Sequence, residues 1–389
     1  MKKILYLSFY FEPDLCAGSF RNTPLAIELA NQLKGIAEVD VYTTMPNRYI
    51  SYNKSANEKE KRGNLIIHRI EIPLHKSGLF DQINSFRKYY FKVKALTKNN
   101  EYDLIFASSS RLFTAYLGHS ISKVKRLPYY LDIRDVFYDS LKDLIRTNPL
   151  KKVILPILKH IEKITFTNAA HINLISEGFI TYFKEYEKPQ KTSFPNGIDD
   201  QFLNIPVFPS INDFKKKRIL YAGNIGEGQG LDKLIPELAN NFTDQFDFHL
   251  FGDGGAKSEL VNKIADFNCS NVFLHQPVSR KQLMEEYSKT DFFLIHLNDF
   301  DAFKKVLPSK IFELGAYNKP IIAGVGGYAA KFISENLPNV ILFNPCDVDE
   351  CTNQLKNYKY ELVERTEFIK KFKRSNINYQ MAKSIVSYL

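Results

Sequence analysis

The feature that most constrains the fold is a regular alternation between short apolar runs and segments of helical period. The apolar runs are rich in Ile, Leu, Val and Tyr, which is typical of buried strands. Strands that alternate with helices favour parallel sheets built from strand-helix-strand units. The pattern occurs twice, which predicts an α/β chain with two doubly wound, Rossmann-like domains. The expected strands are 3–10, 37–43, 64–71, 103–108, 128–133, 170–175 and 191–194, then 217–222, 246–251, 271–275, 291–297, 319–323 and 339–343. The expected helices of the first half include 20–34, 82–98, 110–124 and 150–167.

A turn- and proline-rich stretch separates the two halves. It contains Asn196-Gly197-Ile198-Asp199-Asp200 and then Pro206 and Pro209, a composition that commonly marks a domain boundary. Two such domains facing one another leave a cleft at the carboxyl ends of their strands, where doubly wound sheets bind ligands. The end of the chain is expected to be a helix that can pack back on the N-terminal domain. The predicted divisions are an N-terminal domain over 1–200, a linker over 201–215, a C-terminal domain over 216–370 and the closing helix over 371–389.

The composition is that of a globular protein that does not cross a membrane. The 389 residues are 44% hydrophobic and 25% charged, and no run approaches the roughly 18 consecutive apolar residues of a membrane-spanning helix. The apolar run after Met1-Lys2-Lys3 ends at Glu12-Pro13 without a small-residue cleavage site, so we interpret it as a buried strand and not as a signal peptide. The four cysteines lack a Cys-x-x-Cys pair, and the histidines lack a His-Glu-x-x-His spacing. We therefore expect a cytoplasmic protein with no disulfide framework and no metal site.

The net charge of +10 is concentrated in the first half of the chain. Residues 1–200 hold 30 Lys and Arg against 21 Asp and Glu, and the rest holds 23 against 22. A basic segment over 82–98 interleaves cations with aromatic residues, and a second one covers 150–159. The first predicts binding to an anionic membrane surface, with an ordinary solvated helix face as the alternative. No nucleic-acid module accompanies it, so we do not expect a nucleic-acid partner. The cations of the first segment are Arg87, Lys88, Lys92, Lys94 and Lys98.

The segment from Leu307 to Ala323 is the strongest candidate site. Pro308 and Ser309 favour a helix start, so Lys310 would lie in the first turn, where free N–H groups favour a phosphate. Glu313 is one turn further on and could reach ribose hydroxyls. The alternative at this point is a simple capping arrangement with surface charges.

Together with other motifs, this segment resembles the retaining glycosyltransferase family four, in the branch that builds bacterial surface polysaccharides. The resemblance implies the two-domain GT-B fold and a sugar donor activated as a nucleotide diphosphate, for which we expect UDP. It also implies a lipid-linked or polysaccharide acceptor of O-antigen or capsule synthesis, retention of configuration, no metal and no other cofactor. The enzyme would work at the inner face of the cytoplasmic membrane. The matching motifs are Tyr10-Phe11-Glu12-Pro13-Asp14, Gly18-Ser19-Phe20-Arg21, Thr44-Met45-Pro46-Asn47-Arg48-Tyr49, Ile133-Arg134-Asp135, Asn196-Gly197-Ile198-Asp199, Gly223-Asn224-Ile225-Gly226, Gly252-Asp253-Gly254 and Pro308-Ser309-Lys310.

The same resemblance implies which residues bind the donor. Gly18 allows close backbone approach, and Arg21 offers a two-pronged contact for phosphate; an ordinary glycine turn with a surface arginine is the alternative. In the second domain the implied contacts come from two loops, from the segment after a later strand and from the candidate site. They are Gly223, Asn224, Gly226, Gly252, Gln276, Ser309, Lys310 and Glu313.

Two departures from the family pattern affect this prediction. Many members carry an arginine and a lysine in the loop of 223–230, and this chain has neither, so Lys310 should take more of the diphosphate charge. The family also has two glutamates separated by seven residues, and Lys305 stands in place of the first. Asp299 or Asp301 could substitute for it.

The catalytic residues implied by the resemblance are Arg134, Asp135 and Lys310. Asp135 could accept the proton of the acceptor hydroxyl or orient that hydroxyl, whereas an ion pair that only holds the loop is equally compatible with Arg134. Ser109 and Asp132 are expected to lie on the acceptor side.

Three other functions remain open. A nucleotide-sugar epimerase of similar build would change the sugar without an acceptor, and a non-catalytic partner of a transferase would fit the loss of the first glutamate. A nicotinamide dehydrogenase is least favoured, because Gly252-Asp253-Gly254 does not extend to the full Gly-x-Gly-x-x-Gly fingerprint.

Overall fold

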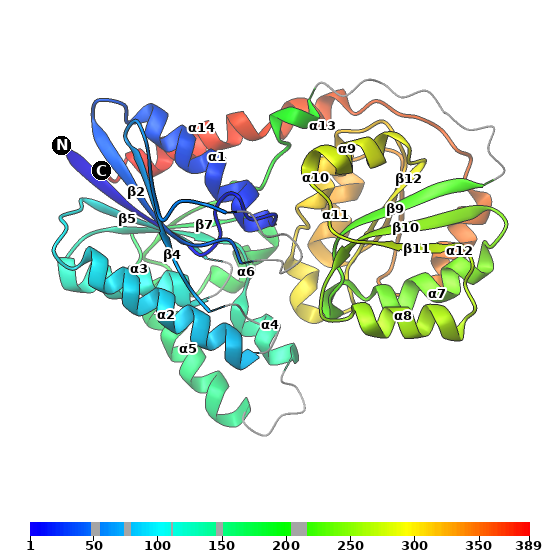
Figure 1. The fold of residues 1–389 in the computed structure, drawn as a ribbon, viewed down its shortest axis with the longest axis horizontal. Coiled ribbons are helices and arrows are strands. Elements are labelled where there is room, and N and C mark those ends of the chain that lie inside the picture. The colour runs from blue at the N-terminus through cyan, green and yellow to red at the C-terminus, as the bar shows by residue number, and fades with distance from the viewer. Residues whose placement is uncertain (48–54, 74–78, 110–111, 145–150, 204–215) are drawn as a thin grey trace. The chain divides into compact units, whose positions relative to one another are not determined.

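The computed structural model describes residues 1–47, 55–73, 79–109, 112–144, 151–203 and 216–389. The chain forms two compact units: in Figure 1 one is coloured blue to green together with the red C-terminal helix, and the other is coloured green to orange. Unit 1 consists of Met1–Asn196 together with Ser375–Leu389, and unit 2 consists of Gly197–Arg374. Within the described residues, every helix falls short of the length and apolarity that a membrane crossing requires.

Unit 1 is built on an eight-stranded sheet with the order β3-β4-β2-β1-β5-β6-β7-β8. All neighbouring strands are parallel except β3, which pairs antiparallel with β4. The strands are β1 (Lys2–Ser8), β2 (Ala37–Thr44), β3 (Lys59–Arg62), β4 (Leu65–Ile70), β5 (Leu104–Ser109), β6 (Tyr129–Ile133), β7 (His171–Leu174) and β8 (Gln190–Thr192). The helices that pack around them are α1 (Ala17–Gln32), α2 (Leu79–Thr97), α3 (Leu112–Lys125), α4 (Phe137–Leu144), α5 (Lys151–Thr167), α6 (Ile180–Phe183) and α14 (Arg374–Val386).

Helices cover both faces of this sheet, which explains why its central strands are continuous apolar runs. Helices α1 and α14 lie on one face and α2, α3 and α5 on the other (Figure 1). On the first face, Leu25 and Leu29 of α1 and Ile385 of α14 are fully buried in one core with Ile4 and Tyr6 of β1. The last helix of the chain therefore completes the core of unit 1.

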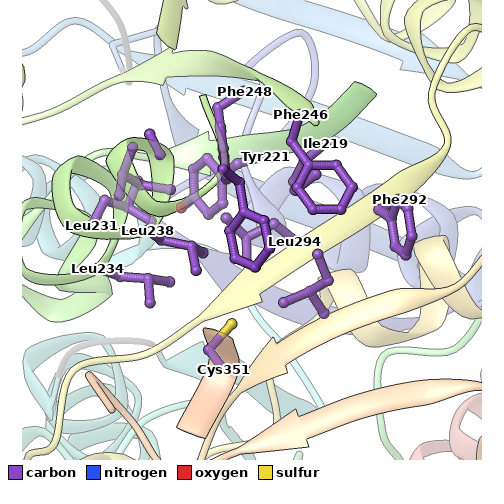
Figure 2. Close-up of a cluster of buried hydrophobic side chains, with 14 of the residues drawn as sticks. Ile219, Tyr221, Leu231, Leu234, Leu238, Phe246, Phe248, Phe292, Leu294 and Cys351 are labelled. Atoms are coloured by element: carbon purple, nitrogen blue, oxygen red, sulfur yellow. The ribbon is translucent and has the colours of Figure 1, made fainter. Parts of the chain in front are cut away.

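Unit 2 contains a six-stranded, fully parallel sheet with the order β11-β10-β9-β12-β13-β14. Figure 2 shows its core, in which Phe246, Phe248 and Leu294 of the sheet pack with Leu234 and Leu238 of α7. The strands are β9 (Lys217–Asn224), β10 (Phe246–Asp253), β11 (Val272–His275), β12 (Phe292–His296), β13 (Ile321–Gly324) and β14 (Val340–Phe343). The helices are α7 (Leu231–Asn241), α8 (Lys257–Asp266), α9 (Arg280–Ser288), α10 (Lys310–Gly315), α11 (Gly327–Asn336), α12 (Val348–Asn357) and α13 (Thr366–Lys371).

The predicted fold class, two doubly wound α/β domains, is confirmed. Each expected strand is present, and β3 is an additional strand that the sequence pattern did not reveal. Its residues, Lys-Glu-Lys-Arg, are all charged, as suits an exposed edge, and so they carry no apolar signal. The first segment of unit 1 ends at Asn196 rather than at residue 200, and most of the predicted linker falls on 204–215, outside the described residues. Within the predicted closing helix of 371–389 the structure has α14 (Arg374–Val386), and Ser375–Leu389 belong to unit 1.

Candidate functional site

Lys310 and Glu313 form an ion pair at the start of α10. The Nζ atom of Lys310 lies 2.9 Å from Oε1 of Glu313 and donates a second hydrogen bond to the Tyr287 hydroxyl, at 3.0 Å. Tyr287 in turn donates to the same carboxylate oxygen at 2.8 Å. Ser309 precedes the helix, but its side chain makes no capping hydrogen bond, so the simple capping arrangement is not what this segment forms. Because α10 has only six residues, the side chains rather than the helix itself supply the charge here.

Burial and positive charge act in opposite directions on the Glu313 carboxyl. Burial alone would raise its pKa, but the cations of Lys310 and Arg280, with hydrogen bonds from Lys310 and Tyr287, hold the pKa below its ordinary value. The Glu313 side chain is 11% exposed and that of Lys310 is 30% exposed. Glu313 is therefore favoured as a carboxylate, and the side chain of Lys310 is partly open to solvent, where a polar ligand can reach it.

Tyr287 is a site residue that the sequence analysis missed. Its ring is fully buried against Phe293 and Tyr317, with centroids 5.2 and 5.4 Å away. Lys319 closes the end of α9 beside it by donating to the carbonyls of Tyr287 and Ser288, at 2.9 and 2.7 Å. A single tyrosine in an amphipathic helix gives no signal of such a role, because only the packing of α9 on α10 brings its hydroxyl to Glu313.

The glycine-rich loop after β9 lies beside the loop after β10. Strand register pairs Gly223 with Gly252 and Asn224 with Asp253, so the carboxyl ends of the two strands meet at one edge of the sheet. A side chain at Gly252 would overlap the Gly223 carbonyl, which makes Gly252 a packing residue beneath the loop. The loop itself is held by Gln229, whose Oε1 accepts from Asn224 Nδ2 at 2.8 Å and from the Gly226 N–H at 3.2 Å.

Strand β11 ends next to β10, and Gln276 follows it with an exposed side chain. Asp299 and Asp301, the proposed substitutes for the missing glutamate, are also exposed, with side chains 62% and 88% accessible. Both face Lys304, which lies 2.7 Å from Asp301 and 3.9 Å from Asp299. Both acids are thus far more exposed than Glu313, whose side chain is 11% exposed.

In unit 1, the structure corrects the prediction for Arg21 and Asp132. The two side chains form a bidentate ion pair, with Nε and Nη2 each 2.8 Å from a carboxylate oxygen. Both are buried, at 2% and 0% exposure. Arg21 also donates to the carbonyls of Phe194 and Pro195 and contacts Met381 Sδ at 3.4 Å, and Asp132 also accepts from Ser108 and Asn173. Arg21 is therefore bonded to groups inside unit 1 and is not available to bind a phosphate. Asp132 is likewise buried and does not face an acceptor.

Arg134 and Asp135 follow β6 and are half-buried. The Nε atom of Arg134 is buried and has no hydrogen-bond partner among the described residues, and burial lowers the pKa of its guanidinium. A side chain at Gly18 would lie 2.9 Å from Nη1 of Arg134, so Gly18 makes room for this arginine.

Ser109 was predicted to lie on the acceptor side. It is only 3% exposed, so it does not line an open site. Arg48 and Tyr49 of the matching motifs lie outside the described residues.

The described part of the chain contains no group of three or more His, Cys, Asp and Glu side chains arranged to hold a metal ion.

Comparison with known proteins gives one family and a group of similar structures. Residues 207–374, most of unit 2, match the family described as Glycosyl transferases group 1. No curated protein sequence matches the chain significantly.

Three solved structures illustrate the fold similarity. Sucrose-phosphate synthase from Thermosynechococcus elongatus has a TM-score of 0.75 at 15% identity, covering 100% of this chain and 99% of that one. The Anabaena protein HepE, solved in complex with UDP, has a TM-score of 0.68 at 16% identity, with both chains fully covered. The lipopolysaccharide outer core galactosyltransferase WaaB has a TM-score of 0.63 at 15% identity, also with full coverage of both chains. At these identities the similarity establishes the GT-B fold. Together with the family match over residues 207–374, it supports a transferase.

Proposed function

We propose that the enzyme transfers a sugar, with retention of configuration, from a UDP-sugar to a lipid-linked or polysaccharide acceptor in cell-surface glycan synthesis. The observation that carries the proposal is the half-open pair of Lys310 and Glu313 within the domain that matches the family. Two similar structures, one solved in complex with UDP and one of a lipopolysaccharide galactosyltransferase, support the donor and the acceptor class.

In this proposal the two charged groups act on different parts of the donor. Lys310 stabilises the negative charge that develops on the departing diphosphate, which is the main catalytic effect expected of a metal-independent transferase. Glu313 accepts hydrogen bonds from the ribose hydroxyls. In the free chain the two groups neutralise each other, so donor binding exchanges the Lys310–Glu313 contact for one contact with phosphate and one with ribose.

Titration with uridine, UMP and UDP tests this division of roles. Lys310→Ala should remove the gain in affinity from the diphosphate, a loss of about 1.5–3 kcal/mol, and should spare uridine binding. Turnover should fall by roughly tenfold to a hundredfold. Lys289→Ala is a matched control in the same unit. Like Lys310, Lys289 forms an ion pair with a glutamate three positions away, here Glu286 at 3.0 Å. Full UDP affinity and full turnover in Lys310→Ala would contradict the donor site and favour the non-catalytic function.

For the acceptor, we propose that Asp135 orients or deprotonates the attacking hydroxyl and that Arg134 lies beside the reacting sugar. Asp135→Asn should lower turnover strongly while leaving the dissociation constant for UDP within a few-fold. Asp139→Asn, four residues further along and also half-buried, serves as the control. A large loss of UDP affinity in Asp135→Asn would instead assign Asp135 to the donor site or to the structure of the loop.

We also propose that unit 1 binds an anionic membrane surface through α2. Arg87, Lys88 and Lys92 are exposed, and Phe91 between them is 62% exposed. Lys94 contributes less, because it donates a hydrogen bond to Ser120 at 3.1 Å. Each exposed cation near such a surface contributes roughly 1 kcal/mol.

Vesicle sedimentation with anionic and neutral liposomes measures this effect. The triple change of Arg87, Lys88 and Lys92 to Gln should abolish most binding to anionic vesicles. The same change at three exposed lysines of unit 2, Lys331, Lys356 and Lys359, should leave it intact. Equal sedimentation of the wild type and the α2 variant would rule out this surface and leave α2 an ordinary solvated helix.

A further inference from the structure

His296, the last residue of β12, is buried and bonded through both ring nitrogens. It is 2% exposed. Its Nδ1 lies 2.6 Å from the Gln229 carbonyl, and the backbone N–H of Cys346 donates to Nε2 at 3.0 Å. Because a carbonyl oxygen can only accept a hydrogen bond, Nδ1 must carry the proton. Nε2 is then unprotonated and accepts from Cys346. Burial lowers the pKa of the ring to about 4, which keeps this neutral tautomer at physiological pH.

The same segment holds the rest of the turn that contains Gln229. Asn298 donates from Nδ2 to the Glu227 carbonyl and from its backbone N–H to the Gly228 carbonyl, both at 2.9 Å. Three successive carbonyls, those of 227, 228 and 229, are therefore bonded to the two residues 296 and 298. A turn whose carbonyls are all bound on one side has little freedom to rotate its peptide planes.

Gln229 links this turn to the predicted donor residues. While its carbonyl accepts from His296, its side-chain Oε1 accepts from Asn224 Nδ2 and from the Gly226 N–H. The ring needs space that the neighbouring strand provides, because a side chain at Gly324 of β13 would overlap it. A continuous chain of hydrogen bonds thus runs from Cys346 through His296 and Gln229 to the glycine-rich loop.

We propose that His296 is a positioning residue for the donor site, acting through Gln229 to hold Asn224 and Gly226 in their binding conformation. This inference rests on the proposed donor site in the loop after β9. The ring contacts no donor atom itself; its part is to pre-organise the loop, so that binding does not require ordering of the turn. A purely structural role would make the same contacts but would affect only the stability of unit 2.

Two substitutions of His296 test the hydrogen bonds of its two ring nitrogens separately. Asparagine keeps an amide near the place of Nδ1 and loses the acceptor for Cys346, whereas glutamine keeps an amide near the place of Nε2 and loses the bond to Gln229. His296→Gln should weaken UDP binding about tenfold, as expected for one lost hydrogen bond that pre-organises the site, and His296→Asn should weaken it severalfold less. Hydrogen exchange of the Gln229 and Gly230 amides, measured without nucleotide, should be faster in His296→Gln than in His296→Asn.

Asn271→Ala is the control for stability. The Asn271 side chain is also buried, and it bridges the carbonyls of Ala239 and Phe246, at 3.0 and 2.9 Å, at the opposite edge of the sheet. The Asn271→Ala variant should have a lower melting temperature and an unchanged affinity for UDP.

If the wild type binds UDP and His296→Gln binds it as tightly, the positioning role is wrong. Equal weakening by the asparagine and glutamine variants would also overturn it, because the bond to Gln229 would then carry no special part. If the wild type binds no UDP at all, the proposed function itself fails, while the exchange rates still report whether His296 holds the turn.

Discussion

Two cation–carboxylate pairs, one in each unit, have the same chemistry and different accessibility. Arg21 and Asp132 of unit 1 are 2% and 0% exposed, whereas Lys310 and Glu313 of unit 2 are 30% and 11% exposed. In the first pair, Arg21 donates to Asp132 and to two backbone carbonyls, and Asp132 also accepts from two neighbouring side chains. The second pair shares one oxygen of Glu313 between Lys310 and Tyr287. A charged pair that is closed to solvent supports the fold, and a pair that is half-open can exchange its contacts for those of a ligand.

The physical reason for the contrast is desolvation. Burying two charges costs several kcal/mol for each ion, and this cost is offset only when the geometry is very good and the remaining hydrogen-bonding positions are filled. Arg21 and Asp132 meet that condition. Lys310 keeps contact with solvent, so its ion pair is worth little for stability and little is lost when a phosphate takes the place of the carboxylate.

The largest expected effect is on the closed pair. Arg21→Met should lower the free energy of unfolding of unit 1 by about 3–5 kcal/mol, because it leaves the Asp132 charge buried without its partner. Chemical denaturation followed by circular dichroism measures this loss, and Asp132→Leu added to Arg21→Met should recover part of it. Lys310→Ala is the comparison in unit 2 and should cost less than about 1 kcal/mol of stability. The contrast between the two pairs would not stand if Arg21→Met kept full stability and lost UDP affinity.

An intermediate effect is expected for Glu313→Gln, which keeps the shape of the side chain and removes its charge. The variant should bind uridine several-fold more weakly, because a neutral amide is a poorer acceptor for ribose hydroxyls than a carboxylate. It also releases Lys310, so the gain in affinity from uridine to UDP should be kept or increased. Calorimetric titration with both ligands measures the two quantities. A reduced gain on going to UDP would mean that Glu313 is needed to orient Lys310.

The smallest expected effect is on the stability of the protein at acidic pH. The pKa of Glu313 is lowered in the folded chain from an ordinary value of 4.5, and that of Asp132 is lowered from 3.8. A carboxyl with a lowered folded pKa contributes stability that is complete above its unfolded pKa and is lost as the pH falls through the folded pKa. Stability should therefore be level for both pairs above about pH 5.5 and should decline below about pH 4.5.

Unfolding free energies of the wild type and Glu313→Gln between pH 7 and pH 3 test this point. The decline should be shallower in the variant, because its amide does not titrate. Identical slopes would indicate that Glu313 has the same pKa in the folded and unfolded chains.

Local patterns were sufficient to predict most of the fold. Runs such as Ile4–Leu7 and Phe292–Ile295 are apolar and short, so they identify buried strands without reference to the rest of the chain. The same reasoning missed β3, because a charged edge strand is recognisable only from its pairing with β4. It also placed Lys310 and Glu313 in one site, since residues three apart on a helix are neighbours.

The sequence by itself determined the two-sheet architecture, the break between the halves and the identity of the charged residues, because these depend on composition and on contacts between near neighbours. Only the tertiary structure decided which charges are available. Asp132 lies 111 positions from Arg21, and Tyr287 lies 26 from Glu313. His296 reaches Gln229 across 67 positions and Cys346 across 50. Whether a charged group is sealed or open depends on desolvation by segments that are distant in the chain, and no local pattern encodes that burial.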